Sequence, residues 1–98
     1  MKTLDDVHQL PGMLSVAEVE CLFRLGQFNG ATGVIVEIGS WKGKSTVALG
    51  LGAATVHNEK IYAVDPHRIL PEEGYLEDTE AEFLANITRS GVDAQSFR

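Results

Sequence analysis

The sequence predicts an α/β fold with a parallel sheet, in the element order α-β-α-β-α. Two segments with the pattern of buried strands alternate with helical segments, and a helix that crosses between two strands normally leaves them parallel. The chain has 98 residues, of which 44% are apolar and 22% charged. That length and composition are typical of one small globular unit.

The first helix is predicted to follow Pro11-Gly12, which is a turn signal. Ser15 and Glu18 have the spacing of a capping box, in which each side chain accepts a hydrogen bond from the other residue's backbone N–H. Apolar residues in 16–25 then recur at helical intervals. Asn29-Gly30 is expected to end this helix.

Two strands and a second helix follow. Residues 33–39 have apolar side chains at both parities, as in a parallel strand buried on both faces. A helix is predicted from Lys44 to about His57, and its Gly50 and Gly52 suit close packing against the sheet. Residues 60–66 form a second buried strand, which stops at its proline because proline cannot continue a ladder.

The last helix is predicted to open with a second capping box, Thr79-Glu80-Ala81-Glu82. It should run to Arg89, with Gly91 at the position of a C-terminal cap. Residues 67–77 read as a loop. Residues 92–98 leave two alternatives open, a turn or the approach to a third strand.

Charge and composition exclude several classes of partner. The net charge is -6 and the pI about 4.9, which argues against binding through nucleic-acid phosphates. No apolar run approaches the ~20 residues of a membrane helix, and the N-terminus lacks the apolar part of a secretory signal. Cys21 is the single cysteine, so no disulfide or cysteine metal cluster forms within the chain. We expect a cytoplasmic protein without nucleic-acid, membrane or metal partners.

Chemistry is expected in residues 37–46, between the first strand and the second helix. Glycines there let the backbone approach a ligand, and the helix N-terminus presents free N–H groups. A P-loop needs four residues between its first glycine and Gly-Lys-Ser, whereas Gly39 and Gly43 enclose three. A dinucleotide fingerprint would need glycine at Trp41. A nucleotide phosphate-binding protein stays an alternative because of Gly43-Lys44-Ser45.

The pattern acid-x-Gly-x-x-x-Gly, filled by Glu37, Gly39 and Gly43, resembles the first motif of the class I S-adenosylmethionine-dependent methyltransferases. Asp65 ends the second strand, where an acid can bind ribose hydroxyls. The sequence around both motifs, including Asp65-Pro66-His67, is similar to that of macrocin-type O-methyltransferases and cephalosporin-hydroxylase-like proteins. The resemblance covers residues 33–67 and implies a Rossmann-like methyltransferase fold.

The resemblance implies S-adenosylmethionine as cofactor and assigns roles to the motif residues. Gly39, Ser40 and Gly43 would bring backbone close to its amino-acid and ribose parts. Glu37 would meet the ammonium directly or order the loop, and Asp65 would hold the ribose.

Trp41 and His67 complete the expected cofactor site. Trp41 is placed beside the ligand, and its alternative is packing under the loop. His67 follows the motif acid and would line the adenine side or assist a metal. Its alternative is an ordinary loop position.

The acids and lysines also have structural alternatives. Glu37 would then be a buried acid paired with Lys42 or Lys44, since buried charges are costly unless paired. Asp65 would cap the turn that follows it. Lys44 is expected to be a solvated lysine at the start of its helix.

Compared with a complete class I methyltransferase, residues 1–98 are expected to be a single partial domain, truncated to the N-terminal cofactor-binding half. No acceptor base is identifiable, and the metal-binding carboxylates of the macrocin branch would lie beyond Arg98. The expected function is cofactor binding in a small-molecule O-methyltransferase with a hydroxylated acceptor, inactive alone. The alternative from another class is a non-catalytic α/β interaction module.

The first strand is central in a complete methyltransferase sheet, so here its outer edge is expected to be unpaired and apolar. Such an edge is a template for association. We therefore expect a homo-oligomer, formed through this edge by strand pairing or by exchange of a helix.

Overall fold

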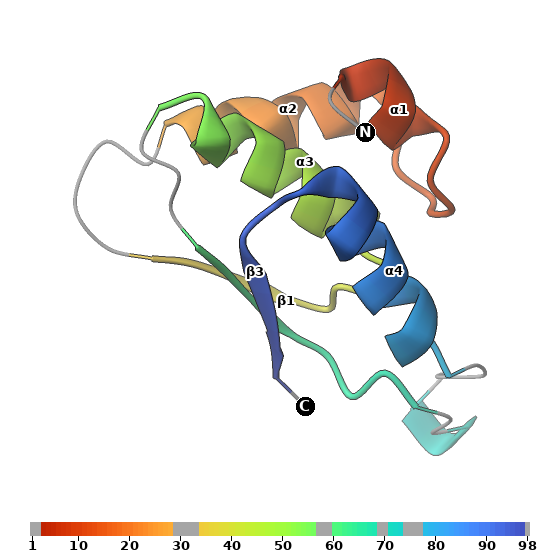
Figure 1. Cartoon of the computed structure of the whole chain (residues 1–98). Coiled ribbons are helices and arrows are strands. Elements are labelled where there is room, and N and C mark those ends of the chain that lie inside the picture. Colours follow the sequence, from red (N-terminus) through yellow and green to blue (C-terminus); the bar gives the residue numbers. More distant parts are fainter. Residues whose placement is uncertain (1–2, 29–33, 57–59, 69–70, 74–77, 98) are drawn as a thin grey trace.

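A computed structural model describes the chain at residues 3–28, 34–56, 60–68, 71–73 and 78–97. Figure 1 shows a small parallel sheet with the helices gathered on one side of it. The architecture confirms the predicted α/β class, and the order of its longer helices and strands is the one predicted.

Among the residues that the structure describes, the sheet has three parallel strands in the order β1-β2-β3. They are β1 (Ile35–Ile38), β2 (Ile61–Val64) and β3 (Ala94–Phe97). β3 settles the alternative left open for the last residues: they form a third strand beside β2. The ladder continues past the strand ends, where the Asp65 N–H donates to the Phe97 carbonyl at 2.9 Å.

In the described part of the chain, the α-helices that accompany the sheet are α1 (Leu4–His8), α2 (Val16–Gln27), α3 (Lys44–Ala54) and α4 (Glu80–Ser90). A short 3-10 helix, η1 (Pro71–Glu73), lies in the predicted loop. No described helix is long and apolar enough to span a bilayer.

The ends of the helices show which of the predicted capping residues form their hydrogen bonds. Ser15 and Glu18 form the predicted capping box at α2, and Gly91 caps α4 with φ 74°. α1 was not predicted, although Thr3 and Asp6 form a capping box of the same kind. Its five residues are too few to show helical periodicity.

The capping box predicted at Thr79 is wrong. Thr79 is the N-cap residue of α4, but its side chain makes no capping hydrogen bond. Its Oγ1 instead lies 2.9 Å from Nδ1 of His67. The hydroxyl predicted to cap the helix therefore bonds to a residue that is distant in sequence.

The helix predicted to reach about His57 ends at Ala54, where Thr55 forms the C-cap. His57 lies outside the described residues. The predicted stop at Asn29-Gly30 and the first residue of the 33–39 strand lie outside them too.

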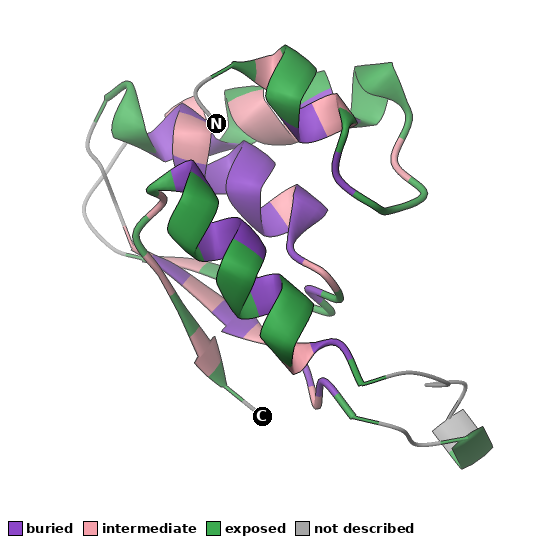
Figure 2. Cartoon of the chain, turned by 45° about the vertical axis from the view of Figure 1, so that its right-hand side comes forward, coloured by how far each residue is buried: buried purple, intermediate pink, exposed green. Residues whose placement is uncertain are grey.

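Burial of the strands on both faces was also predicted, and it is wrong. Glu37 of β1 and Ile61 of β2 are buried on the helix side, whereas Val36 and Ile38 are 58% and 78% exposed. Figure 2 shows the buried residues on the helix side of the sheet and exposed ones along the strands. The described helices cover one face, so alternate residues of β1 meet no packing partner.

Two helix glycines make their closest contacts with another helix rather than with the sheet. A Cβ on Gly52 would lie 1.9 Å from the carbonyl oxygen of Phe23 in α2, and a Cβ on Gly26 would lie 2.1 Å from that of Leu49 in α3. The small surface of α3 therefore lets α2 approach closely. This pair of helices closes the core above the sheet, which includes Val7, Val19, Val47, Ala48, Ala63 and Phe83.

Candidate functional site

The turn that leaves β1, residues 39–43, is called the glycine loop below. Gly39 and Gly43 have φ of 84° and 95°, a region that glycine enters without a steric penalty. The Gly39 N–H donates to the Val64 carbonyl at 2.8 Å, and the Gly43 N–H donates to that of Ser40 at 2.9 Å. The first bond ties the loop to β2, and the second closes the turn that leads into α3.

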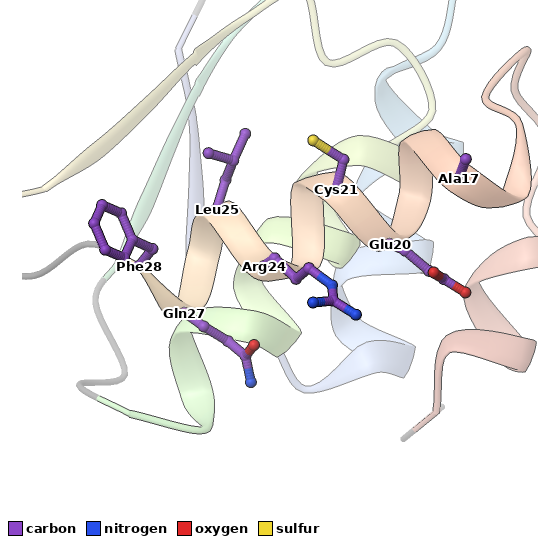
Figure 3. Close-up of a pocket in the computed structure, with 7 residues that line it drawn as sticks. All are labelled: Ala17, Glu20, Cys21, Arg24, Leu25, Gln27 and Phe28. Carbon is purple, nitrogen blue, oxygen red and sulfur yellow. The ribbon is translucent and has the colours of Figure 1, made fainter.

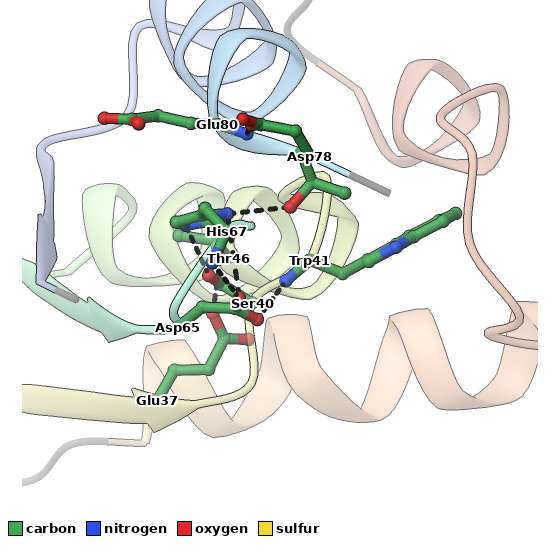
Figure 4. Close-up of polar contacts among 9 residues, drawn as sticks. Glu37, Ser40, Trp41, Thr46, Asp65, His67, Asp78 and Glu80 are labelled. Atoms are coloured by element: carbon green, nitrogen blue, oxygen red, sulfur yellow. Dashed lines mark hydrogen bonds and ion pairs between the residues drawn. The ribbon is translucent and has the colours of Figure 1, made fainter. Parts of the chain in front are cut away.

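Asp65, at the end of β2, contacts this loop directly. Its Oδ2 accepts a hydrogen bond from the backbone N–H of Trp41 at 2.9 Å, and its Oδ1 accepts one from that of His67 at 2.8 Å (Figure 4). The side chain is 4% exposed. The bond to His67 is the turn cap that we gave as the structural alternative. A carboxylate has about four acceptor positions, so two N–H donors leave capacity for a ligand.

Glu37 lies on the helix side of β1 and accepts a hydrogen bond from the Thr46 hydroxyl of α3. Burial raises the pKa of its carboxyl, while the Ser45 and Thr46 side chains counter part of that rise. The alternative pairing with a lysine is not observed. Lys42 Nζ lies 3.4 Å from Glu82 Oε1, and Lys44 Nζ donates to a carbonyl oxygen.

Lys44 is not the solvated lysine that we expected, since it is 7% exposed. Its ammonium lies 3.5 Å from the His8 carbonyl oxygen, at the last residue of α1. Helix C-terminal carbonyls attract cations, and a Cβ on Gly12 would lie 3.0 Å from the Lys44 side chain. Lys44 therefore joins α1 to the start of α3.

His67 is not an ordinary loop residue either, since its side chain is fully buried. Nε2 lies 3.3 Å from Ser40 Oγ, and Nδ1 lies 2.9 Å from Thr79 Oγ1. Its ring packs on Phe83 with the centroids 4.7 Å apart. With both ring nitrogens engaged by protein hydroxyls, the imidazole is poorly placed to line an adenine or to bind a metal.

Trp41 does not pack under the loop. It has a φ of 47° and is 38% exposed, and its side chain extends away from the Asp65 and His67 cluster (Figure 4). Lys42 Nζ lies 4.6 Å from the ring centroid. The indole is thus available to a ligand at the loop.

α4 holds the other end of the glycine loop. Asn86 Nδ2 donates to the Lys42 carbonyl oxygen at 2.9 Å, and a Cβ on Gly43 would lie 3.2 Å from Phe83. The sequence did not identify Asn86, Thr46 or Thr79 as residues that hold the site together. The one available signal was an asparagine on the apolar face of a helix, next to Phe83 and Ile87 in the helical pattern.

Two hollows differ in what surrounds them. A cavity of about 170 Å³ lies between the glycine loop and residues 12–14, and Lys44 and Ser45 complete its lining. A larger groove of about 690 Å³ runs along the outer side of α2 (Figure 3), lined by Ala17, Glu20, Cys21, Arg24, Leu25, Gln27 and Phe28. The groove includes none of the motif residues. Asp65 and Glu37 do not line the small cavity, although Asp65 bonds to its wall at Trp41.

The donor set suits a ligand that donates hydrogen bonds or carries positive charge. Glu37 and Asp65 bring two buried carboxyl groups to the carboxyl ends of neighbouring parallel strands, where open α/β sheets bind ligands. Within the described part of the chain, no group of three histidine, cysteine or acidic side chains is placed to hold a metal ion. Carboxylate oxygens are the kind of acceptor that the ammonium and ribose hydroxyls of S-adenosylmethionine would need.

Comparison with known protein families identifies a match. A family model described as a methyltransferase domain matches residues 36–96, which include the glycine loop, Asp65 and α4. No curated protein matches the chain.

Proposed function

The chain belongs to the methyltransferase domain family, and from this premise we propose that it binds S-adenosylmethionine at the carboxyl ends of β1 and β2. One observation supports the proposal above the others. The acid that ends β2 is hydrogen-bonded to the loop that leaves β1, so the two motifs form one unit. When bound, the cofactor supplies a methyl group on a positively charged sulfur.

In this proposal Asp65 holds the ribose hydroxyls with its remaining acceptor positions. The N–H groups of Trp41 and His67 fix the orientation of the carboxylate before the ligand arrives. Gly39 lets the ligand approach the backbone, because a Cβ at Gly39 would have no described atom within 4 Å.

Between the two roles considered for Glu37, the contacts favour ordering of the loop. Its carboxyl is buried and bonded to Thr46, in the first turn of α3. It therefore holds the far side of the glycine loop against β1. Direct contact with the ligand ammonium would require part of this bond to be given up.

We further propose that the complete enzyme is a cytoplasmic small-molecule O-methyltransferase of the macrocin type with a hydroxylated acceptor. The motif in residues 36–46 and Asp65-Pro66-His67 support this branch. The 98 residues alone are proposed to bind the cofactor weakly and to transfer no methyl group, since no residue here is assigned to bind or deprotonate the acceptor.

A polyphosphate is a poorer ligand for the same loop. Glu37 and Asp65 would repel it, and the ammonium of Lys44 is already in contact with the α1 carbonyl of His8. The non-catalytic alternative is supported by a different observation, the uncovered apolar face of the sheet at Val36 and Ile38.

Isothermal titration of the purified chain with S-adenosylmethionine, S-adenosylhomocysteine, ATP and NAD tests the proposal. We expect binding of the two adenosyl amino acids in preference to ATP and NAD. Preference for ATP would indicate a phosphate-binding protein, and no binding of any ligand would favour the interaction module.

The role of Asp65 needs its own control, because Asp65→Asn also disturbs the bonds to Trp41 and His67. We therefore compare S-adenosylhomocysteine with its 2′-deoxyribose analogue. Wild-type protein should lose roughly tenfold or more in affinity when this hydroxyl is removed, as for one charged hydrogen bond. Asp65→Asn should bind both ligands equally weakly; an undiminished preference for the ribose would contradict the assignment.

A further inference from the structure

His67 lies where three segments meet: the exit of β2, the glycine loop and the first turn of α4. Its ring contacts Ser40 of the loop through Nε2 at 3.3 Å and Thr79 of α4 through Nδ1 at 2.9 Å (Figure 4). The backbone is held as well, by the bond from its N–H to Asp65 and by the 3.2 Å bond from the Thr79 N–H to its carbonyl.

Two local preferences are given up at this point. His67 has a φ of 55°, a left-handed conformation that a side chain with a Cβ adopts only when its surroundings enforce it. The hydroxyl of Thr79, the N-cap residue of α4, makes no hydrogen bond to the helix. It bonds to the imidazole of His67 instead. Unfavourable local geometry that the surroundings maintain is a feature of functional sites.

The nearby carboxylate of Asp65 favours one arrangement of the protons. A neutral imidazole has one N–H donor and one acceptor nitrogen. Asp65 Oδ1 lies 3.8 Å from Nδ1, and its negative charge favours the proton on that nitrogen. Nδ1–H then donates to Thr79, and Nε2 accepts the proton of the Ser40 hydroxyl, so that hydroxyl has a fixed direction.

This arrangement differs from a nucleophilic serine site. Thr79 takes the hydrogen bond of Nδ1, the carboxylate at 3.8 Å is beyond hydrogen-bond distance, and Ser40 is 2% exposed. The group is therefore built to hold atoms in place rather than to attack a substrate.

We propose that His67 is a positioning residue, which joins Ser40 to Thr79 and so holds the glycine loop in the conformation that binds the ligand. The loop is then fastened at two points by α4, through His67 at Ser40 and through Asn86 at the Lys42 carbonyl. A binding loop ordered in advance loses less conformational freedom when the ligand arrives. The inference rests on the proposed function, because the ligand is S-adenosylmethionine or its product.

Substitutions at Thr79 test it with a built-in rescue. Thr79→Val has nearly the same shape and removes the hydroxyl, whereas Thr79→Ser keeps it. We expect Thr79→Val to weaken S-adenosylhomocysteine binding by roughly tenfold, the size of one buried hydrogen bond, and Thr79→Ser to bind like wild type. Ser90→Ala is the matched control, since it removes a buried hydroxyl from the same helix that bonds to Ile87.

A double-mutant cycle tests the connection itself. Ser40→Ala and His67→Asn should each weaken binding, and the double variant should be no weaker than the weaker of the two, because both remove one coupled contact. Asparagine is chosen because it tolerates the left-handed backbone of position 67. Additive losses would show that the residues act independently and would overturn the proposal.

A measurement on the wild-type chain needs no variant to fold. Nitrogen NMR of the imidazole should show both ring nitrogens in hydrogen bonds when S-adenosylhomocysteine is bound, and the signature of a water-exposed, freely exchanging imidazole would overturn the proposal. Wild-type chain that fails to bind S-adenosylhomocysteine would overturn the proposed function, and this inference with it. Wild-type binding with unchanged affinity in Thr79→Val would overturn the inference alone.

Discussion

The two faces of the sheet are made by the same strands and have opposite environments. On the helix side Ile61 and Ala63 are completely buried, and Glu37 of β1 lies next to them. On the other side Val36 is 58% and Ile38 is 78% exposed. The residues alternate along the strands, so a shift of one position separates the core of the molecule from an exposed apolar surface.

The two faces also differ in where buried polar side chains find hydrogen-bond partners. The buried carboxyl groups of Glu37 and Asp65 have hydrogen-bond donors at the loop end of the covered face. The uncovered face has apolar side chains and the stacked rings of Tyr62 and Phe97, 5.7 Å apart. Exposed apolar patches of this kind mark interaction surfaces. The association of two copies that the sequence predicts at the outer edge of β1 stays a prediction.

Truncation of one isoleucine on each face of the sheet should produce the largest contrast. Ile61→Ala on the covered face is expected to lower the free energy of unfolding by about 2–5 kcal/mol, because it leaves a cavity in the core. Ile38→Ala on the uncovered face should change it by no more than about 0.5 kcal/mol at low protein concentration. Urea denaturation of both variants measures the difference, and equal losses would show that both faces are packed.

A charge on β1, the strand whose outer edge is predicted to associate with a second copy, tests that prediction. The wild-type chain is expected to self-associate at micromolar concentration, and Val36→Lys should weaken association by roughly tenfold or more, since one buried apolar side chain contributes about that much. Sedimentation gives the association constant. Gln95→Lys is the control, because it adds the same charge at an exposed polar position of β3, the strand at the opposite edge of the sheet. A monomeric wild-type chain would contradict the prediction.

The smallest effect concerns the pH dependence of the covered face. Because burial raises the pKa of Glu37 above its ordinary 4.5, the folded state holds this proton more tightly than the unfolded chain. The stabilisation is complete below the ordinary pKa and is lost as the pH rises through the raised one. Wild-type stability should therefore fall relative to Glu37→Gln over that interval.

Urea denaturation at several pH values between about 4 and about 8 measures this difference. Glu20→Gln, an exposed substitution on α2, serves as the control and should run parallel to wild type. If the wild-type and Glu37→Gln curves also run parallel, folding leaves the pKa of this carboxyl unchanged, which would contradict the prediction.

Short-range patterns predicted much of the molecule. The capping box of Ser15 and Glu18, the cap at Gly91 and the two first strands depend on residues only a few positions apart. The bend at Gly39 and Gly43 was likewise visible as a glycine spacing. The placement of Asp65 beside that loop followed from the rule that parallel strands end at the same edge.

Other features depended on partners that no local pattern contains. Thr79 had the sequence of a helix cap, but its hydroxyl bonds to a histidine twelve residues earlier in the chain. The position of Lys44 at the start of a helix predicted a solvated side chain, but the side chain is buried against the end of α1. The apolar residues of β1 predicted two buried faces, although the described helices all pack on one.

The sequence by itself therefore determined the order of the elements, the parallel sheet and the loop at which the two motif acids converge, because these follow from backbone geometry and near-neighbour contacts. Only the tertiary structure decided which hydroxyl His67 engages, which face of the sheet stays uncovered and where Lys44 places its charge. Those outcomes depend on which distant groups meet in space, and a buried polar group bonds to whatever donor or acceptor the packing brings within reach.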